Sequence, residues 1–276
     1  MSSLSMLQEG PVLDPPRGHL PFASELFTVT GVESMLGAAG DLLWVVTYVI
    51  AIWIGFKHRT YAVPLLAVAL NVTWEFVYTV IYPVENRVVF YLHAAWLVVD
   101  LIIVYQIYRF GRKEQRQAFF RKHYPLLLTL TLAACLIFQI TFDRFFYQIA
   151  LFPMETGNGM AFMMNLVMSI LFFGLLFGRE DLRGVSEPIA WTKMIGTALI
   201  SIGNTMAFLA SEGRSYDFQF RPVGSDEAWQ AFTAGTRTLD LRLFYFMFIA
   251  IFVLDVLYIV MVRQAKRRRA EAEVAG

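Results

Sequence analysis

The sequence predicts an all-α membrane protein, built as a bundle of seven transmembrane helices. Of its 276 residues, 57% are hydrophobic and only 16% are charged, whereas a soluble domain has roughly 45–50% apolar and roughly 25% charged residues. Seven stretches contain the roughly 20 mostly apolar residues that a helix needs to cross a bilayer. Their length and continuity favour helices over the shorter, alternating strands of a membrane barrel.

The predicted spans and flanking segments follow one another in a simple order. The seven spans cover residues 36–57, 61–82, 88–109, 124–143, 158–178, 188–210 and 243–263. Residues 1–35 are expected to form an N-terminal arm, with a short interfacial helix from Phe22 to Met35. Residues 211–242 form the one long connection, which we expect to cap the outer mouth of the bundle. The transmembrane domain is therefore 36–263, and residues 264–276 form a basic cytoplasmic tail.

Basic residues in the links predict the orientation of the bundle. They follow the first span, fill the link between the third and fourth spans, join the fifth to the sixth, and end the chain. This side carries fifteen Lys and Arg residues and the other side carries seven, with Lys193 inside the sixth span. Because cytoplasmic loops collect Lys and Arg, we expect the N-terminus outside and the C-terminus in the cytoplasm. The first 35 residues show no pattern of a cleavable signal peptide.

Charge and cysteine content exclude several classes of protein. The 23 basic and 22 acidic residues nearly cancel, so a nucleic-acid partner, which would require a strongly basic face, is not expected. The single cysteine, Cys135, cannot form an intramolecular disulfide, and the sequence has no Cys/His cluster for zinc. The expected surroundings are the lipid bilayer.

Three carboxyl groups lie deep inside predicted spans. Glu75, Asp100 and Asp255 fall in the second, third and seventh spans, where a charged side chain costs at least about 2.5–3.5 kcal/mol. No Lys or Arg lies in the central part of a span, so we expect no full ion pair for these acids. A poorly solvated carboxyl group favours its neutral form, and a protonated carboxyl in an apolar, aromatic pocket is suited to act as a general acid.

Helical spacing groups these acids with aromatic and polar residues, because positions three, four and seven apart share a helix face. The stripes are Asn71, Trp74, Glu75 and Tyr78 in the second span, His93, Trp96 and Asp100 in the third, Asn165 and Ser169 in the fifth, Lys193, Thr197, Ser201 and Asn204 in the sixth, and Phe248, Phe252, Asp255 and Tyr258 in the seventh. The simplest arrangement turns every stripe toward one interior pocket.

Each stripe also has a structural interpretation. Asn, Ser and Thr in transmembrane helices commonly join helices through hydrogen bonds worth about 1 kcal/mol or less. His93 could be the structural partner of a neighbouring acid, and Asp100 could either orient Trp96 or contact a substrate. Trp74 and Trp96 lie too deep for the interfacial aromatic belt. Glu75 and Asp255 remain the strongest catalytic candidates.

Three motifs resemble those of one enzyme family. They are NxxWE at Asn71, Trp74 and Glu75 followed by Tyr78, WxxxD at Trp96 and Asp100 before the run Tyr108-Arg109-Phe110-Gly111, and DxxY at Asp255 and Tyr258. The sequence is therefore similar to the membrane-integral terpene cyclases of fungal meroterpenoid and indole-diterpene biosynthesis and their bacterial relatives. The resemblance covers essentially the whole seven-helix core.

The resemblance implies a terpene cyclase that uses no metal and no cofactor. Such enzymes protonate an epoxide or alkene of a prenylated substrate and guide carbocation cyclisation, as isomerases or lyases. The carboxyls regarded as essential in the family correspond to Glu75 and Asp255, and Asn71, Trp74, Tyr78, His93, Trp96, Asp100, Phe252 and Tyr258 are the expected substrate-binding residues. The sequence contains neither DDxxD nor DxDD, the motifs of magnesium-dependent and soluble protonating cyclases. The enzyme is expected in the endoplasmic reticulum of a fungus or the plasma membrane of a bacterium.

Two other functions are compatible with seven helices. A proton-coupled transporter could use Glu75 and Asp255 as proton carriers, although the sequence has no internal repeat and no span broken by paired Gly and Pro. A seven-helix receptor also fits the topology. Its retinal-binding form would need a lysine in the seventh span, which contains none.

Overall fold

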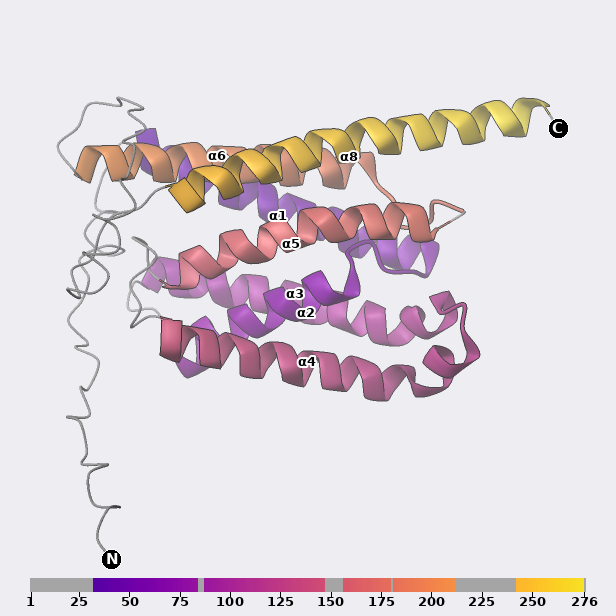
Figure 1. The fold of residues 1–276 in the computed structure, drawn as a ribbon, viewed down its shortest axis with the longest axis horizontal. Coiled ribbons are helices and arrows are strands. Elements are labelled where there is room, and N and C mark those ends of the chain that lie inside the picture. Colours follow the sequence, from indigo (N-terminus) through magenta and orange to yellow (C-terminus); the bar gives the residue numbers. More distant parts are fainter. Residues whose placement is uncertain (1–31, 84–86, 147–155, 180, 212–241, 276) are drawn as a thin grey trace, which may run out of the picture.

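The computed structural model is all-helical and describes residues 32–83, 87–146, 156–179, 181–211 and 242–275. Helices occupy all seven predicted ranges (Figure 1). They are α1 Val32–His58, α2 Leu65–Phe76 with its π-helical continuation η2 Val77–Ile81, α3 Arg87–Glu114, α4 Ala118–Phe146, α5 Thr156–Gly178, α6 Glu187–Ser211 and α8 Arg242–Ala275. The predicted interfacial helix lies largely, and the outer cap almost entirely, outside the described residues. Residues 264–275 continue α8 as a helix.

Five of the described helices are long and apolar enough to cross a membrane, namely α1, α3, α4, α5 and α8. Leu65–Ile81, formed by α2 and η2, is a shorter apolar helix. The predicted all-α fold with several membrane-spanning helices is therefore confirmed, and the count of seven crossings stays a prediction.

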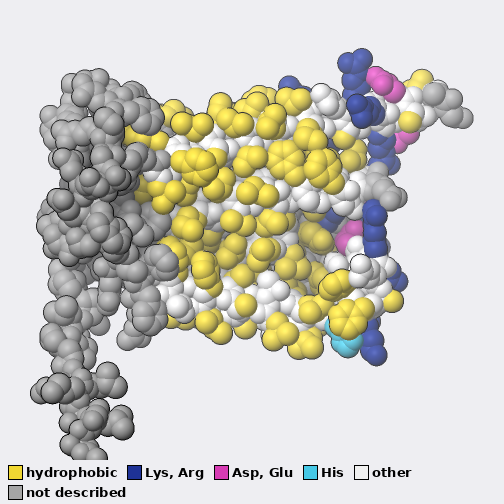
Figure 2. Space-filling view, in the orientation of Figure 1, with side chains coloured by type: hydrophobic (Ala, Val, Ile, Leu, Met, Phe, Trp, Pro, Cys, Tyr) yellow, Lys and Arg dark blue, Asp and Glu magenta, His cyan; other side chains and the backbone are white. Residues whose placement is uncertain are grey.

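The surface has an apolar middle and one basic end. Figure 2 shows hydrophobic side chains across the middle of the face in view, and Lys and Arg side chains at one end. At this end α1, α3 and α5 finish, α4 and α6 begin, and α8 runs out to the C-terminus (Figure 1). An apolar belt with basic residues beyond it is typical of a protein that spans a bilayer.

Six helices form a closed ring of packing contacts. α1 packs against α3, α3 against α2, α2 against α5, α5 against α8, α8 against α6, and α6 against α1. α4 packs against α2, α3 and α5. The buried polar side chains of α2, α3, α5, α6 and α8 are thereby brought into one bundle.

Small residues allow α1 and α6 to approach closely. A Cβ atom on Gly40 would lie 2.6 Å from the carbonyl oxygen of Gly196, and one on Gly203 would lie 2.8 Å from the carbonyl oxygen of Glu33. Glycine at such a crossing lets two helix backbones come into contact. This contact fixes the position of α6 relative to α1.

The turn between α1 and α2 explains where α2 starts. Arg59 ends α1 with a φ of 51°, and the N–H of Thr60 donates to the carbonyl oxygen of Gly55 at 3.0 Å, a common way of closing a helix. Pro64 precedes the first turn of α2. The helix therefore begins at Leu65 rather than at residue 61 as predicted.

Candidate active site

Two groups of buried or half-buried polar and aromatic side chains lie within the ring of helices. We call the first the carboxyl–aromatic centre; it consists of Tyr48, Asn71, Trp74, Glu75, Tyr78, His93, Trp96 and Asp100. We call the second the ion-pair centre; it consists of Asn165, Ser169, Lys193, Thr197 and Asp255. The two expected catalytic carboxyls, Glu75 and Asp255, belong to different centres.

Two acids from neighbouring helices form the core of the carboxyl–aromatic centre. Glu75 of α2 is 2% exposed and Asp100 of α3 is 0% exposed. The two carboxyls interact electrostatically with each other and with Tyr48. Oε2 of Glu75 and both carboxyl oxygens of Asp100 have no hydrogen-bond partner within the described residues. Two adjacent carboxyl groups without a cation cannot readily both be ionised, so such a pair holds a proton.

Aromatic rings gather beside these acids. The ring of Trp74 lies 5.1 Å from that of Tyr78 and 5.0 Å from that of His93, between centroids. His93 in turn stacks on Trp96 at 5.8 Å. Four of the predicted substrate-binding side chains are thus in contact, although they come from three helical segments. The faces of such rings attract cations.

The π-helix η2 shapes this group of rings. The N–H of Tyr82 donates to the carbonyl oxygen of Val77, five residues earlier, at 2.7 Å, so the helix is wider here than an α-helix. The ring of His93 donates a hydrogen bond to the backbone carbonyl of Tyr78. The partner of His93 is therefore a backbone group of η2 rather than a neighbouring acid. π-helical turns are frequent at functional sites, and no pattern in the sequence indicated this one.

α1 adds two residues that the sequence motifs do not include. The hydroxyl of Tyr48 accepts a hydrogen bond from Nδ2 of Asn71 at 2.8 Å. The ring of Trp44, one helical turn earlier, lies 5.8 Å from that of Tyr48. Asp41, Trp44 and Tyr48 follow one another at spacings of three and four. This stripe is a usable signal for an inward face of the first span.

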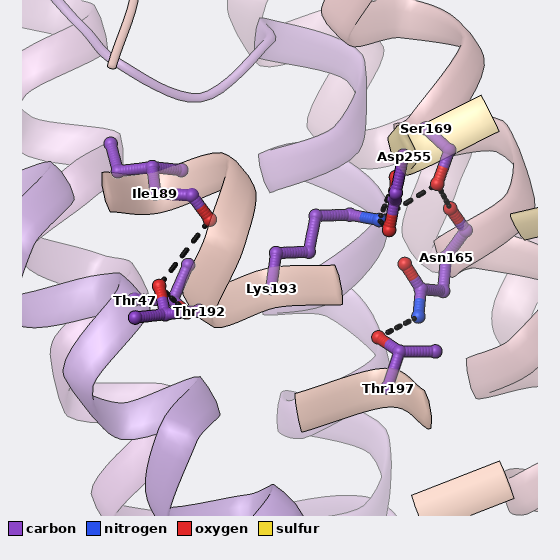
Figure 3. A network of polar contacts seen from close by, with 8 residues as sticks. All are labelled: Thr47, Asn165, Ser169, Ile189, Thr192, Lys193, Thr197 and Asp255. Carbon is purple, nitrogen blue, oxygen red and sulfur yellow. Dashed lines mark hydrogen bonds and ion pairs between the residues drawn. The ribbon is translucent and has the colours of Figure 1, made fainter. Parts of the chain in front are cut away.

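Asp255 of α8 has a cation beside it, so the prediction that none of the deep acids forms a full ion pair is wrong for this residue. Nζ of Lys193 lies 2.8 and 2.7 Å from the two carboxyl oxygens of Asp255 (Figure 3). The same ammonium donates to Oγ of Ser169 on α5 at 2.7 Å. The side chains are almost fully buried, with Lys193 2% and Asp255 4% exposed.

The length of the lysine side chain explains why the structure contains an ion pair that the sequence did not predict. Lys193 lies about 9 Å along α6 from Glu187, and Asp255 lies about 12 Å along α8 from Arg263, at about 1.5 Å per residue. Glu187 and Arg263 form an ion pair, so both distances start from the same level of the bundle. A lysine near the end of a span usually extends its charge toward water. Figure 3 shows that Lys193 extends toward Asp255 instead.

The remaining polar residues of this centre link helices. Nδ2 of Asn165 on α5 donates to Oγ1 of Thr197 on α6 at 2.8 Å, and Oγ of Ser169 donates to the backbone carbonyl of Asn165 at 3.0 Å (Figure 3). These contacts agree with the structural interpretation of Asn, Ser and Thr in membrane helices.

Trp44 lies between the two centres. Nζ of Lys193 is 5.9 Å from the centroid of the Trp44 ring, on a side chain that also contacts Tyr48. α1 therefore contributes an aromatic wall that runs from the carboxyl–aromatic centre to the ion-pair centre.

Two predicted residues of α8 have contrasting surroundings. Tyr258 is buried, and its ring lies 5.2 Å from that of Phe172. Phe252 is 49% exposed, so its expected position in the interior is incorrect. The buried stripe of α8 passes through Ile251 and Asp255, and residue 252 is rotated by roughly 100° from residue 251. Phe252 therefore faces outward.

Comparison with known proteins identifies the family. The model of the Pyr4-like transmembrane terpene cyclases matches residues 21–210 of this chain. The chain belongs to this family. The matched region contains Glu75, Asp100 and Lys193 and ends before Asp255, so the ion-pair centre joins a residue inside the match to one beyond it. The resemblance drawn from the sequence motifs is confirmed.

Individual relatives are also terpene cyclases of fungi. The terpene cyclase andB of Emericella variicolor is 27% identical over 195 residues, which are 70% of this chain and 80% of the relative. The terpene cyclase macJ of Penicillium terrestre is 30% identical over 176 residues, or 61% and 65% of the two chains. The terpene cyclase pyr4 of Aspergillus fumigatus is 31% identical over 107 residues, or 38% and 44%. No solved structure matches this chain.

Proposed function

We propose that this Pyr4-like transmembrane terpene cyclase protonates an epoxide or alkene of a prenylated meroterpenoid or indole-terpenoid substrate, and guides the resulting carbocation without a metal or cofactor. The observation that carries the proposal is the contrast between the buried acids. Glu75 faces another carboxyl group, whereas Asp255 faces an ammonium group. Acids with such opposite neighbours are suited to opposite steps of proton transfer.

Glu75 starts the reaction in this proposal. Its carboxyl group donates a proton to the epoxide oxygen, and the bond from that oxygen to the more substituted carbon breaks, leaving a hydroxyl group and a carbocation. The π-bonds of the prenyl chain then attack in turn, and each new carbon–carbon bond moves the positive charge along the chain. Loss of a proton next to the final cation forms an alkene. One proton enters and one leaves, so the product is an isomer of the substrate.

The aromatic side chains stabilise the moving charge in this mechanism. Trp74, Tyr78, His93 and Trp96 contact one another beside Glu75, and Asn71 positions Tyr48 through its hydrogen bond. A cation over an aromatic face gains about 0.5–2 kcal/mol, with the larger values where water is excluded. Asp100 shares the proton of Glu75. Tyr258 contributes a buried ring close to Asp255.

The test uses membranes that contain the protein and an epoxyfarnesyl-type substrate. We expect a product of unchanged mass and altered chromatographic mobility, and we expect none with Glu75→Gln membranes. Because the chain has no Asp-rich diphosphate motif, turnover should survive EDTA and need no added magnesium. Strict magnesium dependence would indicate diphosphate chemistry. Accumulation of unchanged substrate inside sealed vesicles would instead indicate a transporter.

We further propose seven crossings, with the N-terminus outside and the C-terminus in the cytoplasm. The basic end of the bundle (Figure 2) supports this orientation. A reporter fused after Gly276 or inserted near Gln115 should be cytoplasmic, and one inserted near Gly224 should be outside. Reporters near 115 and 224 on the same side would remove one span from the count.

A further inference from the structure

All three N–H donors of the Lys193 ammonium group have acceptors inside the protein. An ammonium has three donors, and Nζ of Lys193 is 2.8 and 2.7 Å from the two oxygens of Asp255 and 2.7 Å from Oγ of Ser169. Three different helices, α5, α6 and α8, supply these groups. Figure 3 shows the lysine stem extended across the space between α6 and α8, with Asp255 and Ser169 at its end.

This geometry determines what Asp255 can do. Both of its carboxyl oxygens already accept hydrogen bonds from a positive donor, and an ionised carboxylate is an acceptor only. Neutralising one partner of a buried ion pair leaves the other charge uncompensated, which is strongly unfavourable. This geometry favours a pair that is charged on both sides in the resting protein, in which Asp255 has no proton to give.

The neighbourhood of the pair connects it to the proposed reaction. The ring of Trp44 lies 5.9 Å from Nζ of Lys193 and 5.8 Å from the ring of Tyr48, and Tyr48 is hydrogen-bonded to Asn71 of the carboxyl–aromatic centre. The rings of Tyr48 and Trp44 therefore lie one after the other from the carboxyl–aromatic centre to the ion-pair centre, where they can stabilise a cation on its way toward the carboxylate of Asp255.

We propose that Lys193 is a positioning residue that holds Asp255 as an oriented carboxylate, so that Asp255 takes up the proton released in the last step and never delivers the first. This inference rests on the proposed function. In the step assigned to Asp255, a carbon–hydrogen bond next to the final cation breaks, its electron pair forms the alkene, and its proton binds a carboxylate oxygen. Lys193 keeps its own proton throughout.

Infrared difference spectroscopy of the membrane-embedded protein tests the resting state directly. Wild type should have no protonated-carboxyl band that Asp255→Asn removes, whereas Glu75→Gln should remove one. Lys193→Met should gain a protonated-carboxyl band, because Asp255 then lacks its cation, and Lys193→Arg should not. Loss of such a band in Asp255→Asn would overturn the inference. This comparison decides the question even if Lys193→Met fails to fold.

Product analysis tests the role in turnover. Lys193→Met should still consume substrate but form the alkene product at least about tenfold less, with alcohols from capture of the cation by water in its place. Lys193→Arg should restore the alkene product at least in part. Thr205→Val is the control, because Thr205 is also buried on α6 but belongs to neither centre, and its hydroxyl donates to the backbone carbonyl of Ser201 in the same helix. It should leave the spectrum and the products unchanged.

The outcomes separate this inference from the proposed function. Full alkene formation by well-folded Lys193→Met, together with an inactive Glu75→Gln, contradicts only the role of Lys193. Normal turnover by Glu75→Gln contradicts the proposed function itself, whatever Lys193→Met does.

Discussion

The carboxyl–aromatic centre and the ion-pair centre lie in one ring of helices, yet they accommodate buried acids in opposite ways. Glu75 and Asp100 face each other, and three of their four carboxyl oxygens have no hydrogen-bond partner among the described residues. Both oxygens of Asp255 are bound by Lys193. The first arrangement favours retention of a proton, and the second favours a negative charge. In the proposed mechanism, the nearest charged neighbour of each acid, rather than its depth in the membrane, gives it its role.

The comparison also assigns a role to α1. Its polar and aromatic face meets α6 through Trp44 and meets α2 through Tyr48, so it lies beside both centres. In the proposed mechanism, the aromatic face of α1 is suited to guide a cation from the carboxyl–aromatic centre to the ion-pair centre.

The largest expected effect concerns the stability of the ion-pair centre. Asp255→Leu alone should lower the free energy of unfolding by about 3–5 kcal/mol, because it leaves the Lys193 ammonium buried without its counter-ion. Adding Lys193→Met should recover most of that loss without restoring turnover. Thermal unfolding in detergent measures both variants. A double variant as unstable as the single one would show that the pair is not electrostatically coupled.

The next effect separates the two centres by chemistry. Glu75→Gln and Asp255→Asn keep the shape of the side chain but cannot transfer a carboxyl proton, so each should reduce formation of the normal product at least about 10²-fold. Glu75→Gln should also abolish substrate consumption, because no cation forms. Rates in membranes with equal amounts of inserted protein provide the measurement. Near-normal turnover by well-folded Glu75→Gln would defeat the mechanism.

A smaller effect is expected from the aromatic rings. Trp96→Ala removes a π-face worth about 0.5–2 kcal/mol to a cation, but no proton source, so it should permit initiation and yield partly cyclised products. Phe252→Ala is the matched control on α8, because its ring faces outward. Its product pattern should equal that of wild type. A changed pattern in Phe252→Ala would place the substrate path on the outside of α8.

The smallest effect on stability is expected from a solvent-exposed salt bridge, that of Asp181 with Arg183. Partial burial raises the pKa of Asp181, but hydrogen bonds from Arg183 and the charges of Arg183 and Arg179 outweigh it and leave the pKa below its usual value. The resulting stability is present above the unfolded pKa and is lost as the pH falls through the folded one. Asp181→Asn should cost at most about 1 kcal/mol at neutral pH, as measured by thermal unfolding. A loss as large as that of Asp255→Leu would remove the contrast between exposed and buried pairs.

Helical periodicity was enough to identify much of the candidate site. His93, Trp96 and Asp100 are spaced at three and four, and the structure buries His93 and Asp100 and stacks Trp96 on His93. The same periodicity could not determine which residues of α8 face the interior. A stripe defined by spacings of three and four is wide enough to include Phe252 at its edge, and only the packing of α5 and α6 against α8 decides which part of that stripe is buried.

The helices could be predicted from the amino-acid sequence, because a long apolar segment in a bilayer must form a helix. The family could be predicted because the NxxWE, WxxxD and DxxY motifs are short stretches of sequence. The partners of the acids could not, because they depend on the tertiary packing. Lys193 and Asp255 are 62 residues apart and on different helices, so no helical period relates them, and the flexible four-carbon stem of a lysine can point either toward water or inward. The same holds for Tyr48 beside Asn71 and for the widening at η2. Which charge meets which depends on how helices pack, and packing is a property of the whole bundle rather than of any one span.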